Sequence, residues 1–172
     1  MYVRTRVAGV LKDWRTKEQR MDKNIQEVLQ CTCLRMRQTN RLVTQIYDHA
    51  LMATGLTVNQ FGLLANLYGV DLVRSAGLPI GALSERLGTD PTTLNRTLKP
   101  LTARRLVRDL TDPADGRVRI VRITEKGKRE FLEAIPSWRQ AQSRVDGALG
   151  AKTASALNEL LDLCREALLR EA

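Results

Sequence analysis

The sequence predicts a mainly helical protein that carries one small β-hairpin. Apolar residues recur at helical spacing over most of the chain. Two short helical patterns stand back to back between residues 81 and 101. Two segments rich in β-branched residues follow them, separated by the turn sequence DPADG. We therefore expect long helices at both ends of the chain and a compact centre between them.

The first long helix is predicted as a single element over residues 24–53. Apolar side chains from Ile25 to Ala50 keep roughly helical spacing, and Gly55 ends the pattern. A helix of about thirty residues is about 45 Å long, which is more than a small domain needs. We expect this helix to pack against something outside its own domain core.

The remaining helices are predicted from their caps and apolar faces. Thr57 is the expected N-cap of a helix of about ten residues, and VDLVRSAGLP after it is predicted to be a loop. Thr124 is the expected cap of a helix over residues 125–145. A last helix over residues 153–170 places several leucines on one face. These predictions give the order helix, helix, helix-turn-helix, hairpin, helix, helix.

The stretch GALSERLGTDPTTLNRTLKPL has the spacing of a helix-turn-helix motif. Projected at 100° per residue, Leu94, Leu98 and Leu101 fall on one side of the second helix and are expected to be buried. Asp90 is the expected N-cap. Pro91 occupies the first helical position, where proline is tolerated. The second helix is thus predicted to pack its leucines inward and to expose its opposite face.

The exposed face of that second helix is polar and basic. A helix held out on a rigid turn fits the major groove of B-DNA, which is about 12 Å wide. Arg96 can pair bidentately with guanine and Asn95 with adenine, whereas Lys99 is expected to contact phosphate. The DNA-binding residues predicted on this helix are Thr92, Thr93, Asn95, Arg96 and Lys99.

The hairpin adds a second predicted DNA contact. A hairpin directly after such a helix is the winged-helix arrangement, and DPADGRVR places Arg117 and Arg119 at its tip. An arginine on a thin hairpin can enter the minor groove, where narrow A·T tracts concentrate negative potential. Asp115 can hold Arg117 extended through a salt bridge. We therefore predict a winged helix-turn-helix that binds double-stranded DNA.

The charge distribution agrees with a phosphate-bearing partner. The net charge is +9, and residues 90–130 hold 11 Lys and Arg against 6 Asp and Glu. Residues 1–23 are expected to form a mobile basic arm, unless translation begins at Met21. The alternative function is a winged-helix module whose basic face binds an acidic protein partner.

Several other classes of protein are disfavoured by the sequence. No apolar run reaches the roughly 20 residues of a membrane span, and no secretory signal is recognisable, so a cytoplasmic protein with no membrane partner is expected. Three cysteines are too few for a disulfide scaffold. The chain has no Gly-rich phosphate loop, no histidine-based triad and no paired carboxylates. We expect no enzymatic activity and no cofactor.

The pattern resembles the MarR family of bacterial transcription regulators from about residue 24 to the C-terminus. The resemblance rests on YDHALMATGLTVNQFGLLANL, on LPIGALSERLGTDPTTLNRTLKPLTARRLVRD, and on DPADGRVRIVRITEKGK. It implies a homodimer with interlocked first and last helices, usually a repressor of a pseudo-palindromic operator, released by a small molecule or an oxidant. Residues 24–56 and 125–172 would form the dimerisation region, and residues 57–124 the DNA-binding lobe.

The cysteines offer one candidate for the signal input. On one continuous helix Cys31 and Cys33 lie about 200° apart, and the chain has a single histidine, His49, so no metal site is predicted. Cys33 lies fourteen residues before Tyr47, a spacing that resembles the peroxide-sensing branch of the family, where the tyrosine hydrogen-bonds an oxidisable cysteine. Arg37 replaces a second tyrosine of that branch. The alternative is that Cys33 is a buried core residue.

Overall fold

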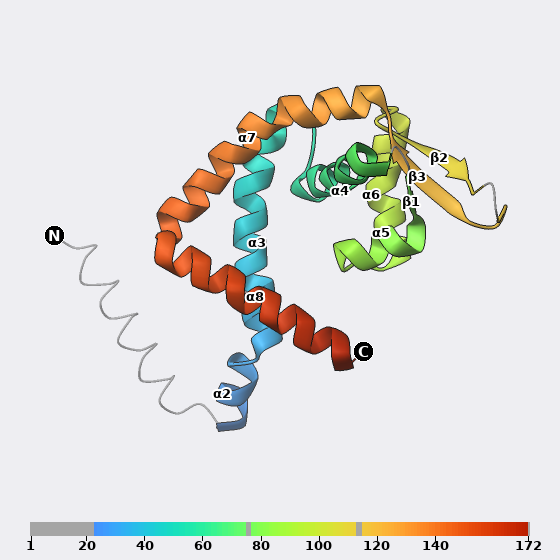
Figure 1. Ribbon diagram of the computed structural model, residues 1–172. Coiled ribbons are helices and arrows are strands. Elements are labelled where there is room, and N and C mark those ends of the chain that lie inside the picture. Colours follow the sequence, from blue (N-terminus) through green and yellow to red (C-terminus); the bar gives the residue numbers. More distant parts are fainter. Residues whose placement is uncertain (1–22, 75–76, 113–114, 172) are drawn as a thin grey trace. The chain divides into compact units, whose positions relative to one another are not determined.

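The computed structural model describes residues 23–74, 77–112 and 115–171 and confirms the mainly helical fold with a small sheet (Figure 1). The elements are α2 (Lys23–Leu29), α3 (Thr32–Leu51), the 3-10 helix η1 (Met52–Thr54), α4 (Val58–Arg74), β1 (Leu78–Pro79), α5 (Ile80–Leu87), α6 (Pro91–Ala103), β2 (Val107–Thr111), β3 (Arg119–Ile123), α7 (Glu125–Leu149) and α8 (Ala151–Glu171).

The chain divides into two compact units within α3, one ending at Leu42 and the other beginning at Val43. In the first unit the prediction of one continuous helix is wrong, because α2 ends at Leu29 and α3 begins at Thr32. The carbonyl oxygen of Cys31 accepts from the backbone N–H of Arg35 at 3.1 Å, so Cys31 precedes α3. Cysteine and threonine are weaker helix formers than the residues around them, which favours a break here. The predicted basic arm, residues 1–23, lies outside the described residues except for its last position.

The helix α4 is longer than predicted. Thr57 caps it as expected, because its hydroxyl accepts from the N–H of Gln60 at 3.3 Å while the Gln60 side chain accepts from the N–H of Thr57 at 3.0 Å. The predicted loop is wrong for residues 70–74, which continue the helix. Asp71 in these last turns is buried and forms ion pairs with Arg122 and Lys128, and these contacts hold the helix end in place.

The core of the second unit is built mainly from leucines. The three leucines predicted to be buried on α6 are at most 1% exposed, which confirms the packing face of that helix. They belong to one core cluster with leucines of α4 and α5 and with Phe131 and Ala134 of α7. The Phe61 ring on α4 lies 5.0 Å from that of Phe131 on α7 and stacks at 6.0 Å on Trp138. The fully buried large side chains of this core are Leu51, Leu63, Leu64, Leu67, Leu83, Leu94, Leu98, Leu101, Leu106, Val107 and Val121.

The sheet has three antiparallel strands in the order β1-β3-β2. The predicted hairpin is confirmed, with Val107 opposite Ile123 and Thr111 opposite Arg119. The short strand β1 was not predicted, because two residues carry no periodicity. The hairpin extends away from the helices of its unit (Figure 1). The described residues after the turn, 115–117, are exposed and accessible to a partner.

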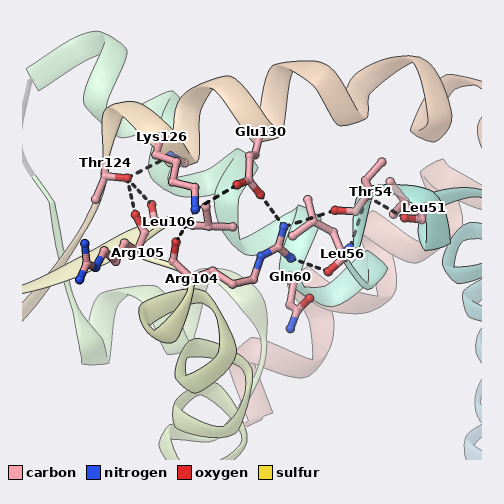
Figure 2. Close-up of polar contacts among 12 residues, drawn as sticks. Leu51, Thr54, Leu56, Gln60, Arg104, Arg105, Leu106, Thr124, Lys126 and Glu130 are labelled. Carbon is pink, nitrogen blue, oxygen red and sulfur yellow. Dashed lines mark hydrogen bonds and ion pairs between the residues drawn. The ribbon is translucent and has the colours of Figure 1, made fainter.

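A polar junction fixes the C-terminal end of α6. The Arg104 guanidinium donates to the carbonyl oxygens of Gly55 and Thr54 and forms an ion pair with Glu130 of α7 (Figure 2). Lys126 donates to the carbonyl oxygen of Arg104 at 3.0 Å. Three segments far apart in the sequence, η1, α6 and α7, therefore meet at one point, and α6 cannot tilt without breaking these contacts.

The start of α7 requires a residue without a side chain. Thr124 caps this helix as predicted, since its hydroxyl accepts from the N–H of Gly127 at 3.0 Å. A Cβ on Gly127 would lie 2.0 Å from the carbonyl oxygen of Leu106, which no side chain permits. The glycine of the TEKG sequence is thus explained by close approach of α7 to the chain that enters the hairpin.

The last two helices are longer than predicted and differ in burial. The helix α7 continues through Pro136 to Leu149, and Phe131, Ala134 and Ala141 along it are buried. Among the 21 described residues of α8, by contrast, none is buried. The α8 leucines that are exposed are Leu160, Leu161, Leu163, Leu168 and Leu169.

Candidate nucleic-acid interface

The second helix of the helix-turn-helix, α6, is capped as the sequence predicts. The Asp90 carboxylate accepts from the backbone N–H groups of Thr92 at 2.9 Å and Thr93 at 3.0 Å. Hydrogen bonds from Thr93 lower the pKa of Asp90 below its ordinary value. The carboxylate stays ionised at neutral pH beside the positive end of the helix dipole, which fixes the first turn of α6.

The outward face of α6 is available to a partner. The five residues predicted to contact DNA are exposed, whereas the leucines on the opposite side are buried. The helix continues through Pro100 to Ala103. The ring of Pro100 is exposed and lies outside the core. The outward face therefore presents hydroxyl and cationic groups, and the amide of Asn95 lies at its flank. The residues of this face are Thr92, Thr93, Asn95, Arg96 and Lys99.

The two predicted arginines of the wing have different surroundings. Arg117 is exposed near the tip, and its backbone N–H donates to the Asp115 carboxylate at 2.9 Å. Asp115 thus shapes the turn through the backbone of Arg117. Arg119 lies further from the tip, where its guanidinium donates to both carboxylate oxygens of Asp109 and to the Oδ1 atom of Asn95. The wing and α6 are therefore connected by a side-chain contact that sequence reasoning missed, although strand register could have paired Asp109 with Arg119.

A buried carboxylate fixes the other end of the wing. Asp71 of α4 is 3.1 Å from the Arg122 guanidinium of β3 and 2.5 Å from the Lys128 ammonium of α7. The hydrogen bond from Lys128, with the nearby Arg122, lowers the pKa of Asp71, and the same contact raises the pKa of Lys128. The root of the wing is thus held to two helices. Sequence reasoning could not find this cluster, because Asp71 lies more than fifty residues before Arg122 and Lys128.

The candidate redox residues lie in different settings. Cys33 is exposed in the second residue of α3, so it is not a core residue of its own chain. Cys31 precedes α3, so the 200° separation expected on one continuous helix does not apply. The hydroxyl of Tyr47 donates to Oε1 of Gln142. Burial, and secondarily the charge of Asp146, raises the pKa of this tyrosine.

A cavity of about 390 Å³ lies between the second half of α3 and α7. Its lining combines apolar side chains with two groups that can carry positive charge, His49 and Arg144. All of its lining residues come after Leu42, so the cavity is a feature of the second compact unit. The residues that line it are Ile46, His49, Ala50, Gln140, Ala141 and Arg144.

Sequence comparison matches the central part of the chain to a known protein family. A profile described as MarR family matches residues 54–118, which hold the helix-turn-helix and most of the wing. No curated protein sequence is significantly similar to the chain.

Structure comparison extends the likeness to most of the chain. The M. tuberculosis transcriptional regulator MosR in complex with DNA is 30% identical, with 78% of this chain and 98% of that chain covered and a TM-score of 0.62. A second structure of M. tuberculosis MosR is 29% identical, covering 81% and 96% with a TM-score of 0.67. A mutant of E. coli MarR complexed with operator DNA is 21% identical and shares the fold, covering 84% and 99% with a TM-score of 0.70.

The exposed basic helix, its rigid turn and the arginine-bearing hairpin define a winged helix-turn-helix protein. Together with the two comparisons, they show that the chain belongs to the MarR family. It is a DNA-binding transcription regulator and not an enzyme. In the part of the chain that the structure describes, no helix is both long and apolar enough to cross a bilayer.

Proposed function

We propose that the protein is a cytoplasmic homodimeric repressor of a pseudo-palindromic operator. The exposed polar and basic face of α6, together with the exposed arginines of the wing, is the observation that carries this proposal. In the proposal, Arg96 and Asn95 read base edges, and Thr92, Thr93 and Lys99 bind the major-groove backbone. Arg117 enters the minor groove, and Arg119 is the second arginine of the wing at the interface with DNA. Residues 57–124 act as the DNA-binding lobe.

The test begins with an operator selected from genomic fragments that the purified protein retains. Affinity for this operator and for random duplex is then measured at about 50 and 200 mM salt, where counterion release predicts a loss of several orders of magnitude. Arg96→Ala should reduce the preference for the operator by about 1–3 kcal/mol. Arg117→Ala should weaken binding to both duplexes alike and lower the salt slope by about one. If both variants keep wild-type affinity and preference, the assigned surface is wrong.

The dimer is supported by the leucines of α8, which the single chain leaves exposed. Residues 24–56 and 125–172 would supply the interface, so each dimer would present two lobes to one palindrome. Sedimentation of the wild type against Leu161→Asp with Leu168→Asp tests this arrangement. The variant should be monomeric and bind operator weakly, and a wild-type monomer would contradict the proposal.

Release by a small ligand is supported by the cavity between α3 and α7. A lining that combines apolar side chains with Arg144 suits a small, anionic, partly apolar molecule. CouR from Rhodococcus jostii RHA1, which shares the fold, has been crystallised with p-coumaroyl-CoA. Thermal shifts with a panel of aromatic carboxylates test the site. Stabilisation of the wild type that is lost in Arg144→Ala is expected, and equal shifts in both proteins would place the ligand elsewhere.

Release by thiol oxidation is the second candidate input, supported by the exposure of Cys33. Cys33 and Tyr47 lie fourteen residues apart on α3, or about 21 Å along a helix axis, so they cannot touch within one chain. A tyrosine that hydrogen-bonds Cys33 would therefore be Tyr47 of the second chain. Peroxide should abolish operator binding in the wild type but not in Cys33→Ser, with Cys31→Ser as the matched control. Equal loss in wild type and Cys33→Ser, or loss in neither, removes the idea.

A further inference from the structure

Arg119 makes a three-way contact between the wing and the recognition helix α6. Its Nε atom donates to Oδ1 of Asp109 at 2.9 Å, and its Nη2 atom donates to Oδ2 at 3.1 Å. Its Nη1 atom donates to Oδ1 of Asn95 at 2.7 Å. Asp109 and Arg119 lie on paired strands, two positions apart in register, so they are diagonal neighbours on one face of the hairpin. The guanidinium therefore binds Asp109 through Nε and Nη2 and directs Nη1 at α6.

This contact changes what Arg119 can contribute to DNA binding. A guanidinium held by a carboxylate in two parallel hydrogen bonds is fixed in orientation, and its charge is compensated. A compensated cation neutralises little phosphate charge, so it displaces few counterions from DNA. Arg117, exposed near the tip, has no such constraint from Asp109. The two wing arginines should thus differ in their effect on the salt dependence of binding.

The contact also changes what Asn95 can read. An asparagine pairs bidentately with adenine by accepting through Oδ1 and donating through Nδ2. In this chain Oδ1 accepts a hydrogen bond from Arg119, which directs the oxygen toward the wing. The bidentate pairing with adenine needs Oδ1 directed at the base, so the contact with Arg119 competes with that pairing and leaves the NH₂ group as the donor that faces outward. Arg96 and Lys99 carry donors only. The outward face of α6 is therefore rich in donors, which match the two acceptors of guanine, N7 and O6. Adenine presents its N6 amino donor beside N7, so a face that only donates matches adenine less well.

We propose that Arg119 is a positioning residue that holds the carbonyl oxygen of Asn95 on the wing, so that Asn95 reads guanine and not adenine. This inference rests on the proposed contact between α6 and the major groove. It assigns specificity to a residue pair, Asp109 and Arg119, that does not itself touch a base edge.

The experiment selects bound sequences from a random duplex library with the full chain, in wild type, Asn95→Ala, Arg119→Ala and the double variant. The wild type should prefer guanine at the position that becomes indifferent in Asn95→Ala. Arg119→Ala should shift that position toward adenine by about tenfold, within the range of one bidentate contact. The double variant should match Asn95→Ala, because Arg119 acts through Asn95.

Two further variants serve as controls. Arg117→Ala should lower the salt slope by about one and leave the base preference unchanged, whereas Arg119→Ala should leave the slope close to that of the wild type. Asp109→Asn keeps the shape of the side chain and removes its charge, so it should shift the same base position in the same direction by a smaller factor. Circular dichroism confirms that each variant is folded.

Two results would overturn the inference and leave the proposed function standing. One is a wild-type preference for adenine at the position that depends on Asn95. The other is an Arg119→Ala variant that lowers the salt slope by about one and keeps the wild-type preference at every position, as a phosphate contact would. A wild type that selects no sequence at all would instead refute the proposed function.

Discussion

Leucines in the core around α4, α5 and α6 and leucines in the C-terminal helix α8 have opposite environments. Leu63, Leu83 and Leu98 of that core are at most 1% exposed. On α8 Leu161 is 45% exposed and Leu168 is 64% exposed. Both patterns have helical spacing, so the spacing shows which residues share a face and not whether that face is covered. The core around α4, α5 and α6 is closed, in part by Leu51 and by Phe131 of α7, whereas the leucines of α8 stay exposed in the single chain.

The largest expected difference comes from truncating one leucine in each region. Leu98→Ala should lower the free energy of unfolding by about 3 kcal/mol, because it leaves a cavity in a closed core. Leu161→Ala should lower it by less than about 1 kcal/mol at low protein concentration. Urea unfolding at several protein concentrations measures both, and the concentration dependence isolates any contribution of a second chain. Equal losses at low concentration would mean that α8 is packed within the single chain.

Removing one carboxylate in each region should give the next largest difference. Asp71→Asn breaks two ion pairs and should cost about 2 kcal/mol at neutral pH. Asp162→Asn, on the exposed surface of α8, should cost almost nothing. Urea unfolding at neutral pH compares the two variants.

The pH dependence sharpens this test. The pKa of Asp71 is lower in the folded chain than its ordinary value of 3.8, so its stabilisation is present above that pH and is lost as the pH falls through the folded value. The gap between wild type and Asp71→Asn should therefore close below about pH 4. A gap that stayed constant down to pH 2 would show that the charge of Asp71 contributes nothing.

The smallest expected effect compares two helix ends. After α6, Arg105 has a φ of 59°, and the N–H of Leu106 donates to the carbonyl of Leu101 in a Schellman-type end. After α7, the left-handed position is already a glycine, Gly150, with a φ of 78°. Arg105→Gly should raise the free energy of unfolding by about 0.5–1 kcal/mol, and Gly150→Ala should lower it by a similar amount. Thermal unfolding measures both, and a loss of stability in Arg105→Gly would reveal a stabilising contact of the arginine side chain.

Much of the lobe could be predicted from the sequence because its signals are local. The Asp90 cap, the leucine spacing of α6 and the turn DPADG each depend on residues within a few positions of one another. Predictions were wrong where the local sequence preference is weak and contacts with distant residues decide the structure. The break before α3 and the extension of α4 to Arg74 are of this kind. The second depends on Asp71, whose partners Arg122 and Lys128 are more than fifty residues away.

The exposed and buried faces of α6 were determined by the sequence alone. A helix has a fixed period, and burial of leucine side chains in a core is favourable. The partners of the charged side chains were decided only by the tertiary structure. Arg119 and Arg117 look equivalent in the sequence, yet the register of β2 and β3 places Asp109 beside one of them and directs it at Asn95. Charge pairing acts over a few ångströms between residues of any separation in the chain, so it follows the fold and not the local pattern.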